Sequence, residues 1–181
     1  MSELIPSHGG YRTLKSFQTT TIIYDLTADF CQKFVKEYRM KDQMVQAARS
    51  GRQNIAEGCH ASGTSKKTEL KLVGVARASL EELLLDFEDY LRQRGLALWE
   101  KEYVEAQKIR KLAYIENRSY LSYKTYCENP ESAANTAICL IHQACYLLDK
   151  QLKALEKQFM EEGGFTERLY KKRTEARELV K

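Results

Sequence analysis

The chain has 181 residues with a formal net charge of +4, and 43% of its residues are hydrophobic while 30% are charged. This length suits one domain with a core of its own, and the composition excludes the collagen-like, low-complexity and disordered classes. A charge of +4 is well below the strong basicity of a dedicated nucleic-acid domain, so electrostatic inferences depend on where the charges lie. With only two prolines and nine glycines, the chain is expected to be helical.

The cysteines and the hydropathy of the chain indicate in which cellular compartment the protein is expected. The five cysteines are an odd number without Cys-x-x-Cys spacing, and the first ten residues lack the basic-then-apolar pattern of a signal peptide. No apolar run approaches the roughly 20 residues needed to span a bilayer. We therefore expect a reduced, cytoplasmic protein that does not enter a membrane.

Apolar and small side chains recur at steps of three and four along the first third of the chain, which predicts two long helices. The first is predicted over about 13–38, with a stripe that consists of Leu14, Phe17, Thr21, Tyr24, Ala28, Cys31, Val35 and Tyr38. The second is predicted over about 40–57, because the following segment, GCHASGTS at 58–65, has the composition of a turn.

The remaining elements are bounded by caps and glycines. Ser65 can cap a third helix over about 66–94, which ends before Gly95. Segment 96–129 follows no single period and is expected to be a partly helical insertion. A fourth helix is predicted over about 132–160, after Pro130. The tail, 165–181, carries six basic and three acidic residues and is expected to be a frayed or partner-dependent helix.

Four long amphipathic stretches without a strand pattern predict an all-α fold, an antiparallel up-down four-helix bundle that forms one domain over 1–181. Small residues gather on the second and third predicted helices. At about 1.5 Å per residue, Gly51 lies about 10 Å before the connecting loop and Gly74 about 13 Å after it. We therefore predict that these glycines face each other and let the two helices approach closely.

The string QMVQAARSGRQNIAEG at 43–58 resembles the signature of a family of four-helix-bundle proteins encoded in ribosomal-RNA intervening sequences. That family also includes Avd, the accessory protein of diversity-generating retroelements. The matching positions, with downstream support from ARASLEEL, are Gln43, Ala47, Ala48, Ser50, Asn54, Ile55, Ala56, Glu57, Gly58, Ser79, Leu80 and Glu82. The stretch 134–159 followed by GGF is similar to the longer subgroup, which carries a four-helix-bundle suffix region. The resemblance implies a non-enzymatic bundle that forms a homopentamer, and for Avd it implies a reverse transcriptase and nucleic acid as partners.

Charge is unevenly distributed despite the small total. From 33 to 77 there are ten basic and four acidic residues, and 81–89 follows with five acidic residues and no basic one. We interpret the basic block as a surface that contacts the phosphates of RNA or DNA. The candidate contacts are Arg49, Arg52, Lys66, Lys67, Lys71 and Arg77. The alternative is a solvated bundle face with ordinary ion pairs.

A second set of residues belongs to the predicted structural motif: Gly51, Asn54, Glu57, Gly58 and Gly74. Asn54 and Glu57 are three residues apart and are expected to anchor the end of the second helix or a subunit contact, because a single carboxylate is weak support for a general base. The loop at 58–65 offers either an anion site at the start of the third helix or a turn with an N-cap.

Two further groups allow a functional and a structural interpretation. Cys139, His142 and Cys145 are residue types that bind zinc, but packed thiols and a hydrogen-bonded histidine are the better interpretation, because further ligands would have to come from elsewhere. The tyrosine-rich stretch 114–126 either stacks bases or covers the end of the bundle or a neighbouring subunit.

The sequence thus predicts a non-enzymatic, oligomeric helical scaffold without a metal or cofactor. It is expected to bind RNA or DNA through its basic surface, with an accessory role to a reverse transcriptase as the most specific form of this hypothesis. The alternative is a structural protein–protein interaction module that does not bind nucleic acid. Binding that falls steeply with salt would distinguish the first from the second.

Overall fold

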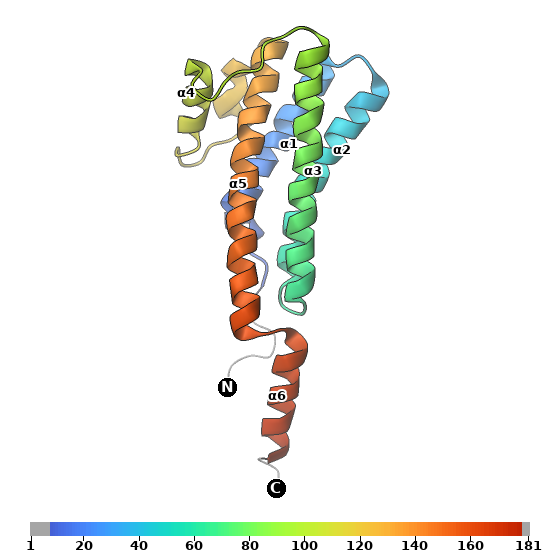
Figure 1. Ribbon diagram of the computed structural model, residues 1–181, viewed down its shortest axis with the longest axis vertical. Coiled ribbons are helices and arrows are strands. Elements are labelled where there is room, and N and C mark those ends of the chain that lie inside the picture. Colours follow the sequence, from blue (N-terminus) through green and yellow to red (C-terminus); the bar gives the residue numbers. More distant parts are fainter. Residues whose placement is uncertain (1–7, 179–181) are drawn as a thin grey trace.

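The structure, a computed structural model, describes residues 8–178, and all regular secondary structure within them is helical (Figure 1). The long helices are α1 (Lys15–Phe34), α2 (Tyr38–Ala61), α3 (Lys66–Gln93) and α5 (Pro130–Glu162), and the shorter ones are α4 (Val104–Leu112), α6 (Phe165–Glu178) and the 3-10 helices η1 (Tyr11–Thr13) and η2 (Tyr120–Tyr126). The predicted all-α bundle is confirmed. The ends of the predicted domain, 1–7 and 179–181, lie outside the described residues.

The four long helices form a closed arrangement in which α1 and α3 each contact both α2 and α5. In Figure 1, α3 rises from the lower end of the bundle while α5 descends beside it. Leu80, Leu83 and Leu140 are fully buried between the helices, and Phe30 of α1 packs edge-on against Phe87 at 5.0 Å. This single apolar core fixes the four long helices relative to one another.

The first helix is shorter than predicted, and its buried face differs. It ends at Phe34, whose carbonyl accepts a hydrogen bond from the Tyr90 hydroxyl at 3.3 Å, and Val35 is extended and buried. The predicted stripe lies at the edge of the buried face: Cys31 and Val35 are buried, and Leu14, Phe17 and Tyr24 pack against the core while partly exposed. The prediction was wrong for Tyr38, which is exposed, and it missed Thr19 and Thr27, which are buried. These two threonines can be buried because their hydroxyls donate hydrogen bonds to the backbone carbonyls one turn earlier in the helix, at 2.8 and 2.7 Å.

The predicted end of the second helix at 57 was also wrong, since α2 continues to Ala61. A Cβ at Gly58 would lie 3.3 Å from the backbone oxygen of Glu69 in α3, so this glycine permits helix contact rather than a turn. A Cβ at Gly51 would lie 2.8 Å from Leu80 Cδ2, which confirms a close approach there. Gly74 has no atom within 4 Å of its Cβ position. The prediction that it faces Gly51 was wrong, because Leu80 occupies that place on α3.

The third and fourth long helices lie close to their predicted positions. Ser65 caps α3 by accepting a hydrogen bond from the backbone N–H of Thr68 at 3.2 Å, and Gly95 follows the helix with a φ of 64°. The Asn129 side chain caps α5, which begins at Pro130. The loop at 58–65 is therefore a continuation of α2 followed by a short turn with an N-cap.

The predicted insertion, 96–129, is partly helical and is fixed to the outside of α5. The nearly fully buried amide of Asn135 accepts from the N–H of Trp99 at 2.7 Å and donates to the carbonyl of Ala97 at 2.8 Å. Helix α4 buries Ala106 and Ile109 against the bundle. In contrast, α6 buries no residue and projects from the lower end of α5 (Figure 1).

Candidate nucleic-acid interface

The six predicted phosphate contacts lie on different sides of the bundle. Arg49 and Arg52 belong to α2, and the Arg52 guanidinium lies 4.4 Å from the ring centroid of Tyr24 in α1. This contact is a cation–π interaction and places Arg52 on the side of α2 that faces α1. Arg49 is exposed nearby. The two arginines therefore form a small basic surface of their own.

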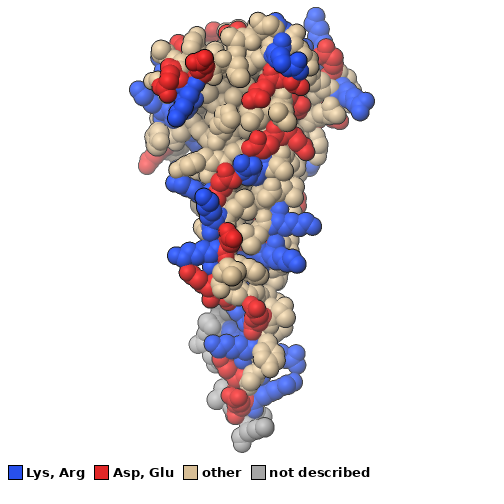
Figure 2. Space-filling view, in the orientation of Figure 1, with Lys and Arg blue, Asp and Glu red and all other residues tan. Residues whose placement is uncertain are grey.

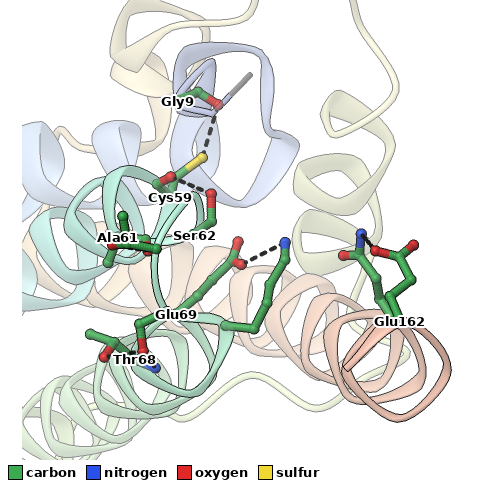
Figure 3. Close-up of polar contacts among 11 residues, drawn as sticks. Gly9, Cys59, Ala61, Ser62, Thr68, Glu69 and Glu162 are labelled. Atoms are coloured by element: carbon green, nitrogen blue, oxygen red, sulfur yellow. Dashed lines mark hydrogen bonds and ion pairs between the residues drawn. The ribbon is translucent and has the colours of Figure 1, made fainter. Parts of the chain in front are cut away.

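Lys66 is neutralised within the chain. Its ammonium lies 3.1 Å from Glu69 Oε2, and the two side chains are only 13% and 8% exposed (Figure 3). A buried lysine that is paired in this way has little of its charge available to an external phosphate. The next lysines, Lys67 and Lys71, are exposed and make no ion pair within residues 8–178.

Arg77 is also occupied by internal partners. Its Nε donates to Asp149 Oδ1 of α5 at 2.5 Å, and Nη1 lies 3.3 Å from Glu81 Oε1. The hydrogen bond to Asp149 raises the pKa of Arg77 above its ordinary value. This arginine joins α3 to α5, as the ordinary ion-pair interpretation expects.

The Arg77–Asp149 pair fixes the register between two antiparallel helices. Four residues beyond Asp149 on α5 is Lys153, which therefore lies at the height of a residue four positions before Arg77 on α3. Lys153 is exposed and makes no ion pair in the described part of the chain. Lys153 thus lies at the height of the first two turns of α3, which carry Lys67 and Lys71. We call these three residues the α3–α5 lysine cluster.

Figure 2 shows this face of the molecule, with blue side chains projecting from both edges below a crowded red group. The red group contains the acidic second half of α3, where burial, followed by the charges of Asp89 and Glu82, raises the pKa of Asp86. The predicted separation of basic from acidic residues is therefore present along α3. Sequence reasoning missed Lys153, because a charge count along the chain does not place α5 beside α3.

The thiol group on α5 has a structural environment. Cys139 and Cys145 are buried, and burial raises the pKa of Cys145 to about 12. His142 is exposed. No group of three or more His, Cys, Asp or Glu side chains suited to a metal ion occurs within residues 8–178. The packed-thiol interpretation agrees with this burial.

The tyrosine-rich stretch divides between the two interpretations. Tyr123 is fully buried, and the Tyr120 hydroxyl donates to Asp29 Oδ2 of α1 at 2.6 Å. These two residues cover the side of the bundle. Tyr114, in contrast, is 89% exposed.

The chain matches a known protein family. The family model described as 23S rRNA-intervening sequence protein matches residues 13–109. The chain belongs to this family. Neither a curated protein nor a solved structure matches the chain. The family is not a known enzyme family, and none of the helices within residues 8–178 has the length and apolar character required to cross a membrane.

The signature of this intervening-sequence protein lies along the seam between α2 and α3. Asn54 donates to the backbone oxygen of Ser50 at 2.9 Å, and the Ser50 hydroxyl lies 2.9 Å from the Ser79 hydroxyl of α3. Glu57 is exposed and has no hydrogen bond or ion pair within the described residues. The predicted anchoring role fits Asn54, while the structure does not bring Glu57 to the same contact.

Proposed function

We propose that this intervening-sequence protein is a non-catalytic, self-associating scaffold that binds RNA or DNA through the α3–α5 lysine cluster. The observation that carries the proposal is that Lys67, Lys71 and Lys153 are each exposed, lie at similar heights on α3 and α5, and have no acidic partner inside the described chain. Unpaired ammonium groups on one face attract phosphates and release their counterions. Arg49 and Arg52 form a separate, smaller basic surface on the α1–α2 side, which serves as the comparison.

The magnitude of the salt effect follows from the number of contacts. Three phosphate contacts per chain give a slope of log K against log [salt] of about −3 for duplex DNA, and about −2 for single strands. An oligomer that presents several clusters to one strand multiplies this dependence. Steep salt dependence is therefore the property that separates phosphate binding from other attraction.

The experiment is a fluorescence-anisotropy titration of labelled RNA and duplex DNA at several salt concentrations. The triple variant Lys67→Glu, Lys71→Glu, Lys153→Glu is expected to abolish binding, while the matched control Arg49→Glu, Arg52→Glu retains it. The reverse result would move the interface to the α1–α2 side. Absence of salt-dependent binding by the wild-type protein would refute the proposal.

Self-association and a protein partner complete the proposal. The family resemblance supports a homopentamer, and an accessory role to a reverse transcriptase gives the scaffold a client enzyme. Light scattering after size exclusion measures the solution mass, and a mass equal to the 21.0 kDa chain would refute self-association. Co-purification with a reverse transcriptase encoded next to the gene tests the second point.

The second candidate function is a protein–protein interaction module that does not bind nucleic acid. Exposed apolar side chains at the start of the insertion favour it, since Leu98 is 52% and Tyr103 is 47% exposed and both line the same surface hollow. Such neighbouring apolar groups are typical of protein contact surfaces. Wild-type self-association without any nucleic-acid binding would support this function instead.

A further inference from the structure

A pocket of about 420 Å³ lies between α1, α5 and the segment at 113–118 that follows α4. It is of the size of small-molecule sites in proteins, which span about 300–1,000 Å³. Its walls include Lys15, Tyr114, Ile115, Arg118, Gln143 and Tyr146. None of these residues belongs to the α3–α5 lysine cluster, so the pocket is independent of the proposed nucleic-acid interface.

Arg118 gives the pocket an unneutralised charge. Its Nη2 donates to Thr19 Oγ1 of α1 at 2.5 Å, and its Nη1 donates to the Tyr123 hydroxyl at 3.2 Å and to Gln143 Oε1 at 3.5 Å. All three acceptors are neutral, and no carboxylate pairs with this half-buried guanidinium within residues 8–178. A half-buried guanidinium without a counterion can form charge-assisted hydrogen bonds to an anionic ligand.

Gln143 supplies a second donor without an acceptor. Its Nε2 is buried and has no hydrogen-bond partner in the described part of the molecule. Buried amide groups are nearly always satisfied, and a rotation of the Gln143 side chain toward the pocket would let this N–H donate to a ligand oxygen beside Arg118. Lys15, which also lines the pocket, is exposed and adds a further positive charge.

The remaining walls define the rest of the ligand. Tyr114, Ile115 and Tyr146 are each more than half exposed and present apolar surface beside the charged end. Glu116 also lines the pocket and disfavours a second negative charge on the ligand. We propose that this pocket binds a small aromatic monocarboxylate, with the carboxylate at Arg118 and Gln143 and the ring between the tyrosines.

The probe for this proposal is benzoate, measured by isothermal titration calorimetry and by thermal shift. Benzamide has the same shape without the charge, and acetate has the charge without the ring. Benzoate is expected to bind and to raise Tm once its concentration exceeds Kd, while benzamide and acetate bind at least about tenfold more weakly. Equal effects of the three compounds, or no binding of benzoate, would overturn the proposal.

The variant Gln143→Leu separates binding from folding. It removes the orphan amide, so the protein is expected to be at least as stable as the wild type, while benzoate binds about tenfold more weakly. Arg118→Lys retains a charge but loses the fork of donors and is expected to weaken benzoate as well. Unchanged benzoate affinity in both variants would overturn the proposal.

Two controls distinguish the pocket from the other surfaces. The Lys67→Glu, Lys71→Glu, Lys153→Glu variant is expected to bind benzoate as the wild type does, even where nucleic-acid binding is lost. If Tyr114→Ser lowers the solution mass and benzoate does not bind, the pocket is a contact between copies of the chain. That outcome would also overturn the proposal.

Discussion

Two glycines in neighbouring helices are expected to respond to the same substitution with opposite signs. Gly51 and Gly74 both lie inside long helices, where Ala is about 1 kcal/mol more favourable than Gly. The added methyl group at position 51 would meet Leu80 Cδ2 at 2.8 Å and Cγ at 3.0 Å, whereas at position 74 it meets nothing within 4 Å. Since both variants gain the same helix propensity, their difference reports packing at the α2–α3 seam alone.

The magnitude follows from the surroundings of Leu80. This side chain is fully buried in the core, so it has little room to change its rotamer. Forcing an extra methyl group into a packed core costs about 1–3 kcal/mol. Gly74→Ala is therefore expected to stabilise the protein by about 1 kcal/mol, and Gly51→Ala to be neutral or to destabilise it by up to about 2 kcal/mol. The gap corresponds to about 2–12 °C in Tm for a chain of this length.

The assay is thermal and urea unfolding followed by circular dichroism at the helix band, at one protein concentration for both variants. A fixed concentration is needed because self-association shifts apparent stability. If Gly51→Ala proves as stable as Gly74→Ala, the close contact with Leu80 does not constrain the seam. That result would contradict the reasoning. In a second test, the double variant Gly51→Ala, Leu80→Ala is expected to lose less stability than the sum of the two single changes, because the smaller residue at position 80 leaves room for the added methyl group.

Three further predictions concern single side chains. Burial and two neighbouring carboxylates raise the pKa of Asp86, so the folded state binds this proton more tightly than the unfolded state does. The contribution of Asp86 to stability is therefore lost as pH rises from the ordinary Asp pKa through the raised pKa of the folded state. Asp86→Asn should therefore raise Tm at pH 7, and this gain should disappear below the ordinary Asp pKa. Because burial raises the pKa of Cys31 and Cys127 to about 11, a thiol reagent should modify them only after denaturation, and rapid native labelling would contradict their burial. Ser79→Ala should cost about 1 kcal/mol in urea unfolding, since it leaves the Ser50 hydroxyl without its cross-helix partner; an unchanged midpoint would contradict this role.

Helices that repeat an apolar period over many residues were predictable from the sequence, and the exceptions have identifiable causes. At the end of α1, the carbonyl of Phe34 accepts a hydrogen bond from the Tyr90 hydroxyl, which is 56 residues away in the sequence. The local sequence around Phe34 does not predict this contact. The prediction for α1 left out Thr19 and Thr27, which are buried because their hydroxyls donate hydrogen bonds to backbone carbonyls of the same helix. Gly58 was read as turn material, although its missing side chain serves contact with α3.

The candidate site was predicted less well, because the charge of a residue depends on partners that the sequence does not place. Lys66 and Arg77 count as basic in the sequence, yet Glu69 and Asp149 neutralise them in the fold. Asp149 is 72 residues from Arg77. The same ion pair sets the register that brings Lys153 beside the first turns of α3. Only Lys67 and Lys71 of the predicted set keep their charge on this face.

The family model matches residues 13–109, which include α1, α2, α3 and most of α4. The signature residues Ser50 and Asn54 form the seam between α2 and α3, so the signature reports helix packing rather than a chemical site. The residues on which both proposals depend, Lys153 on α5 and Arg118 in the insertion, lie beyond the match. A comparison of binding within the family therefore has to include α5 and the insertion as well as the matched residues.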